Sequence, residues 1–154
     1  MGREIERKFL VKDESWRAEA KSSHHIAQAY IASENDSEIR VRIVDGTRAR
    51  LTIKSDRAEE ERAEFEYDVP LEEAKRLYLL AEKGAVLKTR HIVPATDDLE
   101  WEIDVFEGAH AGLVIAEIEL EDAGQSIPSP GWLGEEVTGN ADYYNAILAR
   151  SAAP

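Results

Sequence analysis

The sequence predicts a β-dominated α+β fold: an eight-stranded antiparallel β-barrel, or tunnel, with a few flanking helices. Two observations predict it. Apolar and polar residues alternate with a period of two along most of the chain, which is typical of strands. Helical patterns are few and most connections between strand candidates are short, which favours a closed barrel or a sandwich. The 154 residues are expected to form a single domain, residues 1–154.

Eight segments alternate clearly enough to be predicted as strands. Asp45-Gly46 is a hairpin signal between the third and the fourth of them. The predicted strands are residues 3–12, 24–33, 37–45, 47–55, 62–69, 85–93, 99–107 and 113–121.

Three segments carry helix signals instead. Asp13 is a candidate N-terminal cap, Pro70 stands at a helix start, and Gly84 is a typical helix stop. The predicted helices cover residues 13–21, 70–83 and 142–150.

Composition excludes several classes of function. With 32 acidic against 19 basic residues the net charge is −13, which argues against a nucleic-acid partner. The chain has no cysteine, so disulfides and thiolate metal sites are excluded and carboxylates become the main candidate metal ligands. No signal peptide or membrane-spanning segment is found, which predicts a soluble, cytoplasmic protein without a membrane partner.

The strand candidates carry like-signed charges at positions i and i+2, as in Arg40/Arg42 and Glu117/Glu119. An ordinary antiparallel sheet with one wet face also alternates, and that interpretation stays open here. It predicts scattered charge signs, however, whereas side chains of one sign about 7 Å apart repel unless opposite charge lies between them. The pairs therefore indicate a shared ligand: phosphate oxygens for the cations and Mg²⁺ or Mn²⁺ for the carboxylates.

Seven short motifs follow one another along some 115 residues. They are Glu4-Ile-Glu-Arg-Lys8, Arg40-Val-Arg42, Leu51-Thr-Ile-Lys54, Glu64-Phe-Glu66, Lys88-Thr-Arg90, Trp101-Glu-Ile-Asp104 and Glu117-Ile-Glu119. In this order they resemble the CYTH, or triphosphate tunnel metalloenzyme, family. The later segments Trp132-Leu-Gly-Glu-Glu-Val-Thr138 and Tyr143-Tyr-Asn145 resemble its short, single-domain bacterial members.

The resemblance implies a tunnel that binds a triphosphate together with divalent metal, Mg²⁺ or Mn²⁺, with two ions expected. The basic residues that it implies as the catalytic, phosphate-binding set are Lys8, Arg40, Arg42, Lys54, Lys88 and Arg90. The acidic residues that it implies as metal ligands are Glu4, Glu6, Asp104, Glu117 and Glu119, with Glu64 and Glu66 as helpers. The last helix is expected near one tunnel mouth.

The charges of these residues predict that metal is required. Six cations against seven acids leave about −1, while a triphosphate carries about −4 to −5 near neutral pH. Two divalent ions bring the tunnel to about +3. The expected reaction is in-line attack of a metal-activated water on a terminal phosphorus, with arginines stabilising the transferring group and Lys8 or Lys88 assisting the leaving oxygen.

Three functions remain open on the sequence alone. The first is hydrolysis of inorganic tripolyphosphate; the second is hydrolysis or cyclisation of ATP, as by a nucleoside triphosphatase or an adenylyl cyclase; the third is non-catalytic polyphosphate binding. In each case the partner is a small-molecule triphosphate, and the protein is a monomer or a homodimer.

Several further residues are placed by pattern alone. Gln28 and Tyr30 are expected to face inward, while Arg48 and Arg50 lie close to a turn and are not assigned to the site. The four histidines match no zinc spacing and are not expected to be ligands. The three tryptophans are expected to pack in the core.

Overall fold

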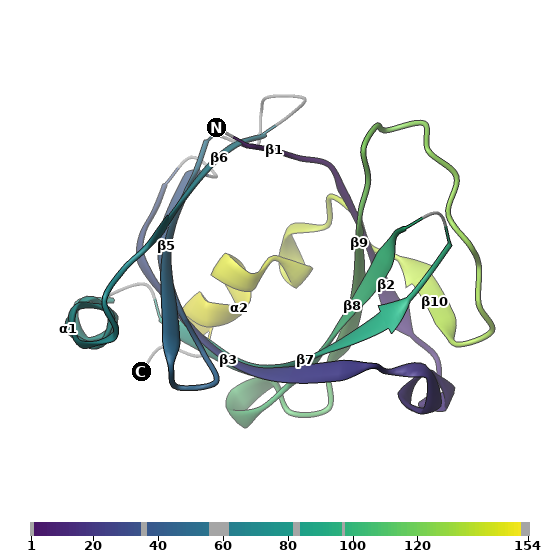
Figure 1. Cartoon of the computed structure of the whole chain (residues 1–154), viewed down its shortest axis with the longest axis horizontal. Helices are drawn as coiled ribbons and strands as arrows, with labels where there is room; N and C mark the ends of the chain where they lie inside the picture. Colours follow the sequence, from purple (N-terminus) through teal and green to yellow (C-terminus); the bar gives the residue numbers. More distant parts are fainter. Residues whose placement is uncertain (1, 35–36, 56–61, 82–83, 97, 152–154) are drawn as a thin grey trace.

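The computed structural model describes residues 2–34, 37–55, 62–81, 84–96 and 98–151. These residues form one antiparallel sheet with the hydrogen-bonded order β1-β6-β5-β4-β3-β7-β8-β9-β2-β10. Figure 1 shows this sheet curled into a ring. Its strands are β1 (Gly2–Glu4), β2 (Glu6–Val11), β3 (Ser22–Glu34), β4 (Ser37–Val44), β5 (Arg48–Lys54), β6 (Arg62–Asp68), β7 (Ala85–Pro94), β8 (Glu100–Phe106), β9 (Val114–Glu119) and β10 (Leu133–Glu136).

The predicted fold class is confirmed, because each of the eight predicted strand ranges overlaps an observed strand. The strand count differs in two places. The first predicted strand is interrupted at Ile5 and becomes β1 and β2, and β10 is an additional strand. With β1 and β2 counted as one segment, the sheet has nine strands rather than eight. β10 is only four residues long, Leu-Gly-Glu-Glu, which is too short to show a reliable alternation.

The ladder does not close into a continuous barrel, since β1 and β10 stand at its two ends. β1 pairs with β6, whereas β2 pairs with β9 on one side and with β10 on the other. The edge of β2 that would complete the ladder is therefore already occupied by β10. The ring is completed by the chain itself, because residues 2–11 run from the β6 edge to the β9 edge (Figure 1).

The helices are short and lie where the sequence predicts them. A 3₁₀ turn, η1 (Ser15–Glu19), falls within residues 13–21, and α1 (Leu71–Leu79) follows Pro70. The predicted last helix becomes the 3₁₀ turn η3 (Ala141–Tyr143) and α2 (Asn145–Ser151); η2 (Gly108–His110) is a further 3₁₀ turn. Within the described ranges, every helix is too short or too polar to cross a membrane.

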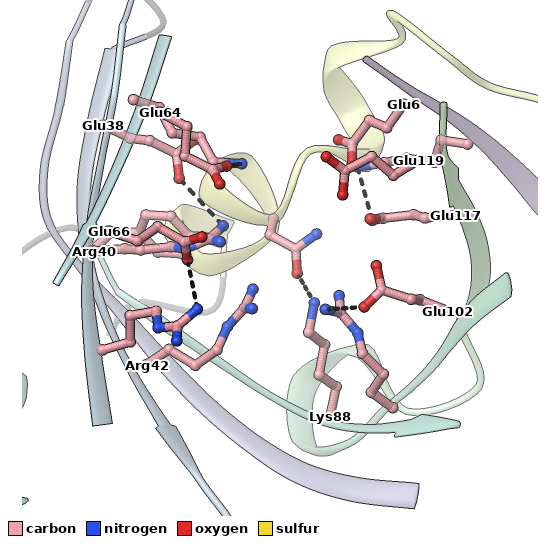
Figure 2. A pocket seen from close by; sticks show the side chains of 16 residues that line it. Glu6, Glu38, Arg40, Arg42, Glu64, Glu66, Lys88, Glu102, Glu117 and Glu119 are labelled. Atoms are coloured by element: carbon pink, nitrogen blue, oxygen red, sulfur yellow. Dashed lines mark hydrogen bonds and ion pairs between the residues drawn. The ribbon is translucent and has the colours of Figure 1, made fainter. Parts of the chain in front are cut away.

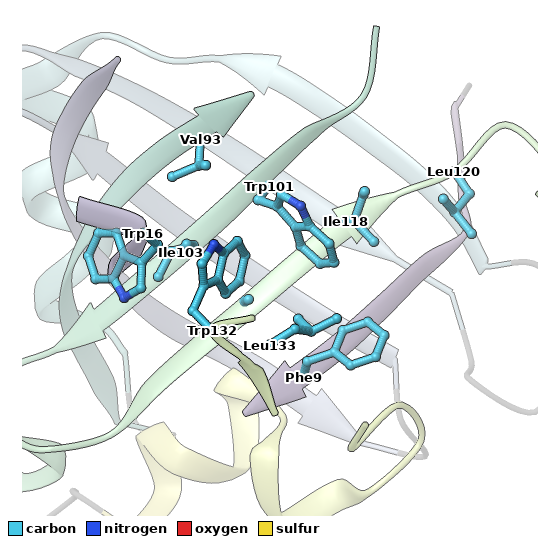
Figure 3. Packing of buried hydrophobic residues seen from close by; sticks show 10 residues of the cluster. Phe9, Trp16, Val93, Trp101, Ile103, Ile118, Leu120, Trp132 and Leu133 are labelled. Atoms are coloured by element: carbon cyan, nitrogen blue, oxygen red, sulfur yellow. The ribbon is translucent and has the colours of Figure 1, made fainter. Parts of the chain in front are cut away.

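The rest of the chain covers part of the outward apolar face of the sheet, whereas Ile53, Phe65 and Tyr67 on β5 and β6 are exposed. Trp16, Trp101 and Trp132 are buried in one cluster with Phe9, over the outer side of β2, β7, β8 and β9 (Figure 3). The rings of Trp101 and Trp132 meet edge to face, with their centroids 5.3 Å apart. The tryptophans are thus packing residues, as predicted. A second cluster lies beneath α1, around Ala74.

The inward face changes from charged to apolar along the strands. Val86, Phe106 and Ile115 continue the same faces as the charged residues two positions away, but they pack against α2. The residues of α2 in this cluster are Ala146, Leu148 and Ala149. α2 therefore covers one end of the ring interior, as the resemblance implies, and the charged residues lie beyond it (Figure 1).

Gly84 fixes the position of α2. Its φ is +85°, and a Cβ placed on it would lie 2.0 Å from the carbonyl oxygen of Ala149. Replacing Gly84 with Ala should therefore cost about 1 to 2 kcal/mol for the left-handed backbone and about 1 to 3 kcal/mol more for the overlap with α2. Chemical denaturation of the variant measures the sum.

Gly139→Ala is the matched control. Gly139 has a similar φ of +79°, but a Cβ on it meets no described atom within 4 Å. This variant should lose only the backbone contribution. Equal losses in unfolding free energy for the two variants would contradict the proposed contact between Gly84 and α2.

Candidate active site

A cavity of about 230 Å³ lies inside the ring, and almost every residue that lines it is charged. Seven lining side chains are basic, seven are acidic, and the other two are Tyr30 and Asn145. The basic ones are Lys8, Arg40, Arg42, Arg50, Lys54, Lys88 and Arg90. The acidic ones are Glu6, Glu38, Glu64, Glu66, Glu102, Glu117 and Glu119.

Alternation along the strands explains this lining. All six predicted basic residues occupy it, together with five of the seven predicted acids. Arg40, Lys88 and Glu117, which come from three different strands, line the same cavity and are buried there. A sheet with one solvated face would instead have left them in bulk water, so that interpretation is wrong.

Two of the seven predicted acids, Asp104 and Glu4, are not among the described residues that line the cavity. Asp104 is fully buried behind the lining. Glu4 ends β1, but its side chain lies outside the described part of the chain.

Five lining residues were not assigned to the site from sequence: Tyr30, Glu38, Arg50, Glu102 and Asn145. Period-two spacing identifies most of them, since Glu38 is two residues before Arg40 and Glu102 two before Asp104. Tyr30 was expected to face inward. Asn145 follows no strand pattern, because it reaches the cavity from α2.

The acids stand on two facing walls (Figure 2). Glu6, Glu117 and Glu119 come from β2 and β9, and Glu38, Glu64 and Glu66 come from β4 and β6. Each wall also carries cations. Lys8 Nζ lies 3.5 Å from Glu117 Oε1, and Lys54 Nζ lies 3.6 Å from Glu64 Oε2.

Burial opposes ionisation of Glu117, but Lys8 and Arg90 nevertheless hold its pKa well below the usual range. Desolvation likewise opposes ionisation of Glu66, whose pKa is lowered by Glu64 and Arg50. These carboxyl groups are therefore negatively charged at neutral pH. Both walls present anionic oxygens to the cavity.

The floor of the cavity contains a buried ion-pair triad of Lys88, Asp104 and Arg90. Lys88 Nζ donates to Asp104 Oδ2 at 2.6 Å, and Arg90 donates to both Asp104 oxygens at 2.7 and 2.9 Å. Arg90 also donates to Glu102 at 2.9 Å. Burial opposes the charge on Arg90, but Asp104 and Glu102 raise its pKa.

Lys88 is only 1% exposed. Burial, only partly offset by Asp104, lowers its pKa to about 7. Both Asp104 oxygens are occupied by cations, so the arrangement favours Asp104 as a residue that orients Lys88 and Arg90. A metal ion at Asp104 would have to share its carboxylate oxygens with these two cations.

The first residue of α2 connects this triad to the opposite wall. Asn145 Oδ1 accepts from Lys88 Nζ at 2.8 Å and from Gln28 Nε2 at 3.3 Å. Gln28 Nε2 also donates to the Tyr30 hydroxyl at 2.7 Å, while Gln28 Oε1 accepts from Arg42 Nε at 2.8 Å. Burial, together with Arg40 and Arg90, lowers the pKa of Arg42 to about 9, which leaves it protonated at neutral pH.

The acids suit a hard divalent cation in their chemistry, because Mg²⁺ and Mn²⁺ prefer oxygen ligands. Within the ranges that the structure covers, however, no three acidic or histidine side chains are arranged to hold an ion by themselves. Mg²⁺ is commonly bound through one or two carboxylates together with substrate phosphates. Glu6, Glu117 and Glu119, which face the cavity together, fit that manner of binding (Figure 2).

The histidines do not enter the cavity lining. His24 contacts Asp45 near the β4–β5 hairpin, His25 lies 3.4 Å from Glu107, and His110 Nε2 lies 2.8 Å from the Leu148 carbonyl oxygen. His91 packs edge to face on Trp16.

Comparison with known proteins gives consistent results. The CYTH domain profile matches residues 2–145. The inorganic triphosphatase of Acetivibrio thermocellus is 38% identical over 152 residues, which cover 98% of this chain and 96% of the relative. That of Nitrosomonas europaea is 36% identical over 151 residues, covering 96% and 97%. A crystal structure of an inorganic triphosphatase, 32% identical, superposes with a TM-score of 0.70 and covers 100% of this chain and 99% of its own.

Proposed function

Because this chain belongs to the CYTH family, we propose that it is a metal-dependent inorganic triphosphatase that hydrolyses tripolyphosphate in the charged cavity. The observation that best supports the proposal is the lining itself: seven basic and seven acidic side chains converge on one small space. The relatives named inorganic triphosphatase cover nearly the whole chain, so the similarity includes every strand of the site.

The charge balance supports a requirement for metal. Seven basic and seven acidic lining residues, with Asp104 behind them, leave about one excess negative charge when all are ionised. A tripolyphosphate carrying about −4 to −5 is poorly matched to such a cavity. Divalent cations bound by the carboxylates of the cavity reverse the balance.

The basic residues bind and orient the phosphates. Arg40, Arg42 and Arg90 can contact phosphate oxygens in bidentate fashion, and they stabilise charge on the phosphoryl group that is transferred. Lys54 neutralises phosphate oxygens near Glu64, while Lys8 and Lys88 do so near α2. The reaction breaks one P–O–P bond: water adds to a terminal phosphorus, and orthophosphate and pyrophosphate leave.

Glu6, Glu117 and Glu119 would hold the divalent cation, with Glu64 and Glu66 assisting from the opposite wall. When bound, the cation supplies positive charge beside the phosphates and makes a neighbouring water more acidic. Two ions, Mg²⁺ or Mn²⁺, remain the expectation. Asp104 contributes by fixing Lys88 and Arg90, both of which it contacts directly.

A substrate panel tests the proposal. Purified protein is given tripolyphosphate or ATP with Mg²⁺ or Mn²⁺, and orthophosphate and cyclic AMP are measured. Tripolyphosphate should be turned over with a higher kcat/KM than ATP under at least one metal. Cyclic AMP as the main product would favour an adenylyl cyclase instead, and tight tripolyphosphate binding without turnover would favour a non-catalytic binding module.

Other features belong to the same proposal. We expect a single-domain, cytoplasmic enzyme that acts as a monomer or a homodimer, with a small-molecule triphosphate and no nucleic acid as its partner. The net charge of −13 supports the last point.

A further inference from the structure

Asn145 occupies an unusual position in the cavity. It is 9% exposed and is the only lining residue from outside the strands among those described. It is also one of only two uncharged side chains in the described lining. Its amide carries one acceptor oxygen and one donor nitrogen, so its contribution to the site depends on which of the two faces the cavity.

The neighbours of Asn145 decide its orientation. Arg42 can only donate, so the Gln28 atom that it contacts at 2.8 Å must be the oxygen. The Gln28 amide nitrogen then points towards Asn145. Lys88, as the ammonium group that pairs with Asp104, also donates, and it contacts the same Asn145 atom at 2.8 Å. Two donors converge on this atom, which must therefore be Oδ1.

In this orientation the amide nitrogen of Asn145 can donate hydrogen bonds to a molecule bound in the cavity. In the part of the chain that the structure covers, every hydrogen bond of this side chain goes to Oδ1. Nδ2 carries two N–H groups and belongs to a residue that lines the space where the phosphates would lie. A phosphate oxygen is a strong acceptor for such a donor.

We infer that Asn145 is a further substrate-binding residue, whose Nδ2 donates a hydrogen bond to a phosphate oxygen of the bound triphosphate. This inference rests on the proposed function. It gives the C-terminal segment a direct part in the site: α2 covers one end of the cavity and also contributes a neutral donor beside Lys88. That donor would strengthen the binding of the triphosphate without changing the net charge of the cavity.

Two substitutions separate contact with substrate from mere positioning of Lys88. Asn145→Asp keeps oxygen acceptors for Lys88 and Gln28 but replaces the N–H donors with an oxygen. Asn145→Ala removes both the acceptor and the donors. If Asn145 binds substrate, kcat/KM for tripolyphosphate should fall about 10- to 100-fold in Asn145→Ala, and at least as far in Asn145→Asp. If it only positions Lys88, Asn145→Asp, which keeps the acceptor for Lys88, should be less impaired than Asn145→Ala.

Asn140→Asp is the matched control. It introduces the same charge in the same segment, at an exposed position whose side-chain oxygen accepts from Asp142 N and which does not line the cavity. This variant should keep wild-type kinetics.

Thermal stabilisation by tripolyphosphate with Mg²⁺ provides a readout that does not need turnover. Wild type should be stabilised by the ligand, and both Asn145 variants should be stabilised less. If wild type hydrolyses tripolyphosphate while Asn145→Asp matches it in kinetics and in ligand-induced stabilisation, the inference about Asn145 is wrong and the proposed function stands. If wild type binds but does not hydrolyse, the proposed function fails, and the ligand-induced stabilisation still tests Asn145.

Discussion

Replacing Glu117 with Gln should lower kcat for tripolyphosphate by about a thousandfold or more. The neutral amide is nearly the same size, but it removes an ionised oxygen ligand from the wall formed by Glu6, Glu117 and Glu119. A bound metal contributes several kcal/mol of transition-state stabilisation, and each 1.4 kcal/mol changes the rate about tenfold. The measurement is the initial rate of orthophosphate release at saturating Mg²⁺ or Mn²⁺.

Glu121→Gln is the control for this variant. Glu121 lies two residues beyond Glu119, is exposed, and does not line the cavity. Its rate should equal that of wild type. A Glu117→Gln enzyme that retained the full rate, while Glu121→Gln also did so, would remove Glu117 from the metal-binding set and with it the assignment of the β2–β9 wall.

Replacing Asp104 with Asn should produce the largest loss of stability in the site. Asp104 is fully buried and accepts from both Lys88 and Arg90. Its loss leaves two buried cations with one fewer counter-charge, and breaking a buried ion pair on one side costs about 3 to 5 kcal/mol. For a chain of this size the melting temperature should fall on the order of 10 °C. Chemical and thermal denaturation in the absence of phosphate measure the effect.

Glu102→Gln isolates the effect of burial. Glu102 is on the same strand and accepts from the same Arg90 at 2.9 Å, but its side chain is 34% exposed. Its replacement should change the unfolding free energy by about 1 kcal/mol or less. Added tripolyphosphate should stabilise Asp104→Asn more than wild type, because it supplies the missing negative charge. An Asp104→Asn protein as stable as Glu102→Gln would contradict the role of the buried triad.

Most of the site could be predicted because the alternation of side chains along a strand can be recognised in its sequence. Residues two apart point the same way, so Arg40 with Arg42 and Glu117 with Glu119 had to share a face. The signs of those pairs then indicated a common ligand. The order of the motifs indicated the family, and the family resemblance implied a triphosphate as the substrate class.

What the sequence did not predict depends on contacts between distant segments. Asn145 enters the cavity only because α2 packs on Val86, Phe106 and Ile115, and no periodicity within residues 142–150 indicates that contact. The sequence indicated Gly84 only as a helix stop. In the structure, the absence of a side chain at Gly84 also makes room for the backbone of Ala149.

Asp104 illustrates a different limit. The period-two alternation of the strand placed it on the inward face correctly, but alternation does not say how deeply a side chain is buried. The structure buries it behind the lining and surrounds it with Lys88 and Arg90. The local pattern of residues 3–12 gives no sign of the interruption at Ile5 either; the two parts pair with different strands, β1 with β6 and β2 with β9 and β10.

Activity should depend on the acidic and basic side chains of one cavity acting together on one triphosphate, and metal dependence tests this most directly. Orthophosphate release from tripolyphosphate is measured with the wild-type protein, first with Mg²⁺ or Mn²⁺ and then after a chelator has removed the metal. Release should occur with metal and should fall to the uncatalysed background without it. An undiminished rate in chelator, or no release with either metal, would contradict the account.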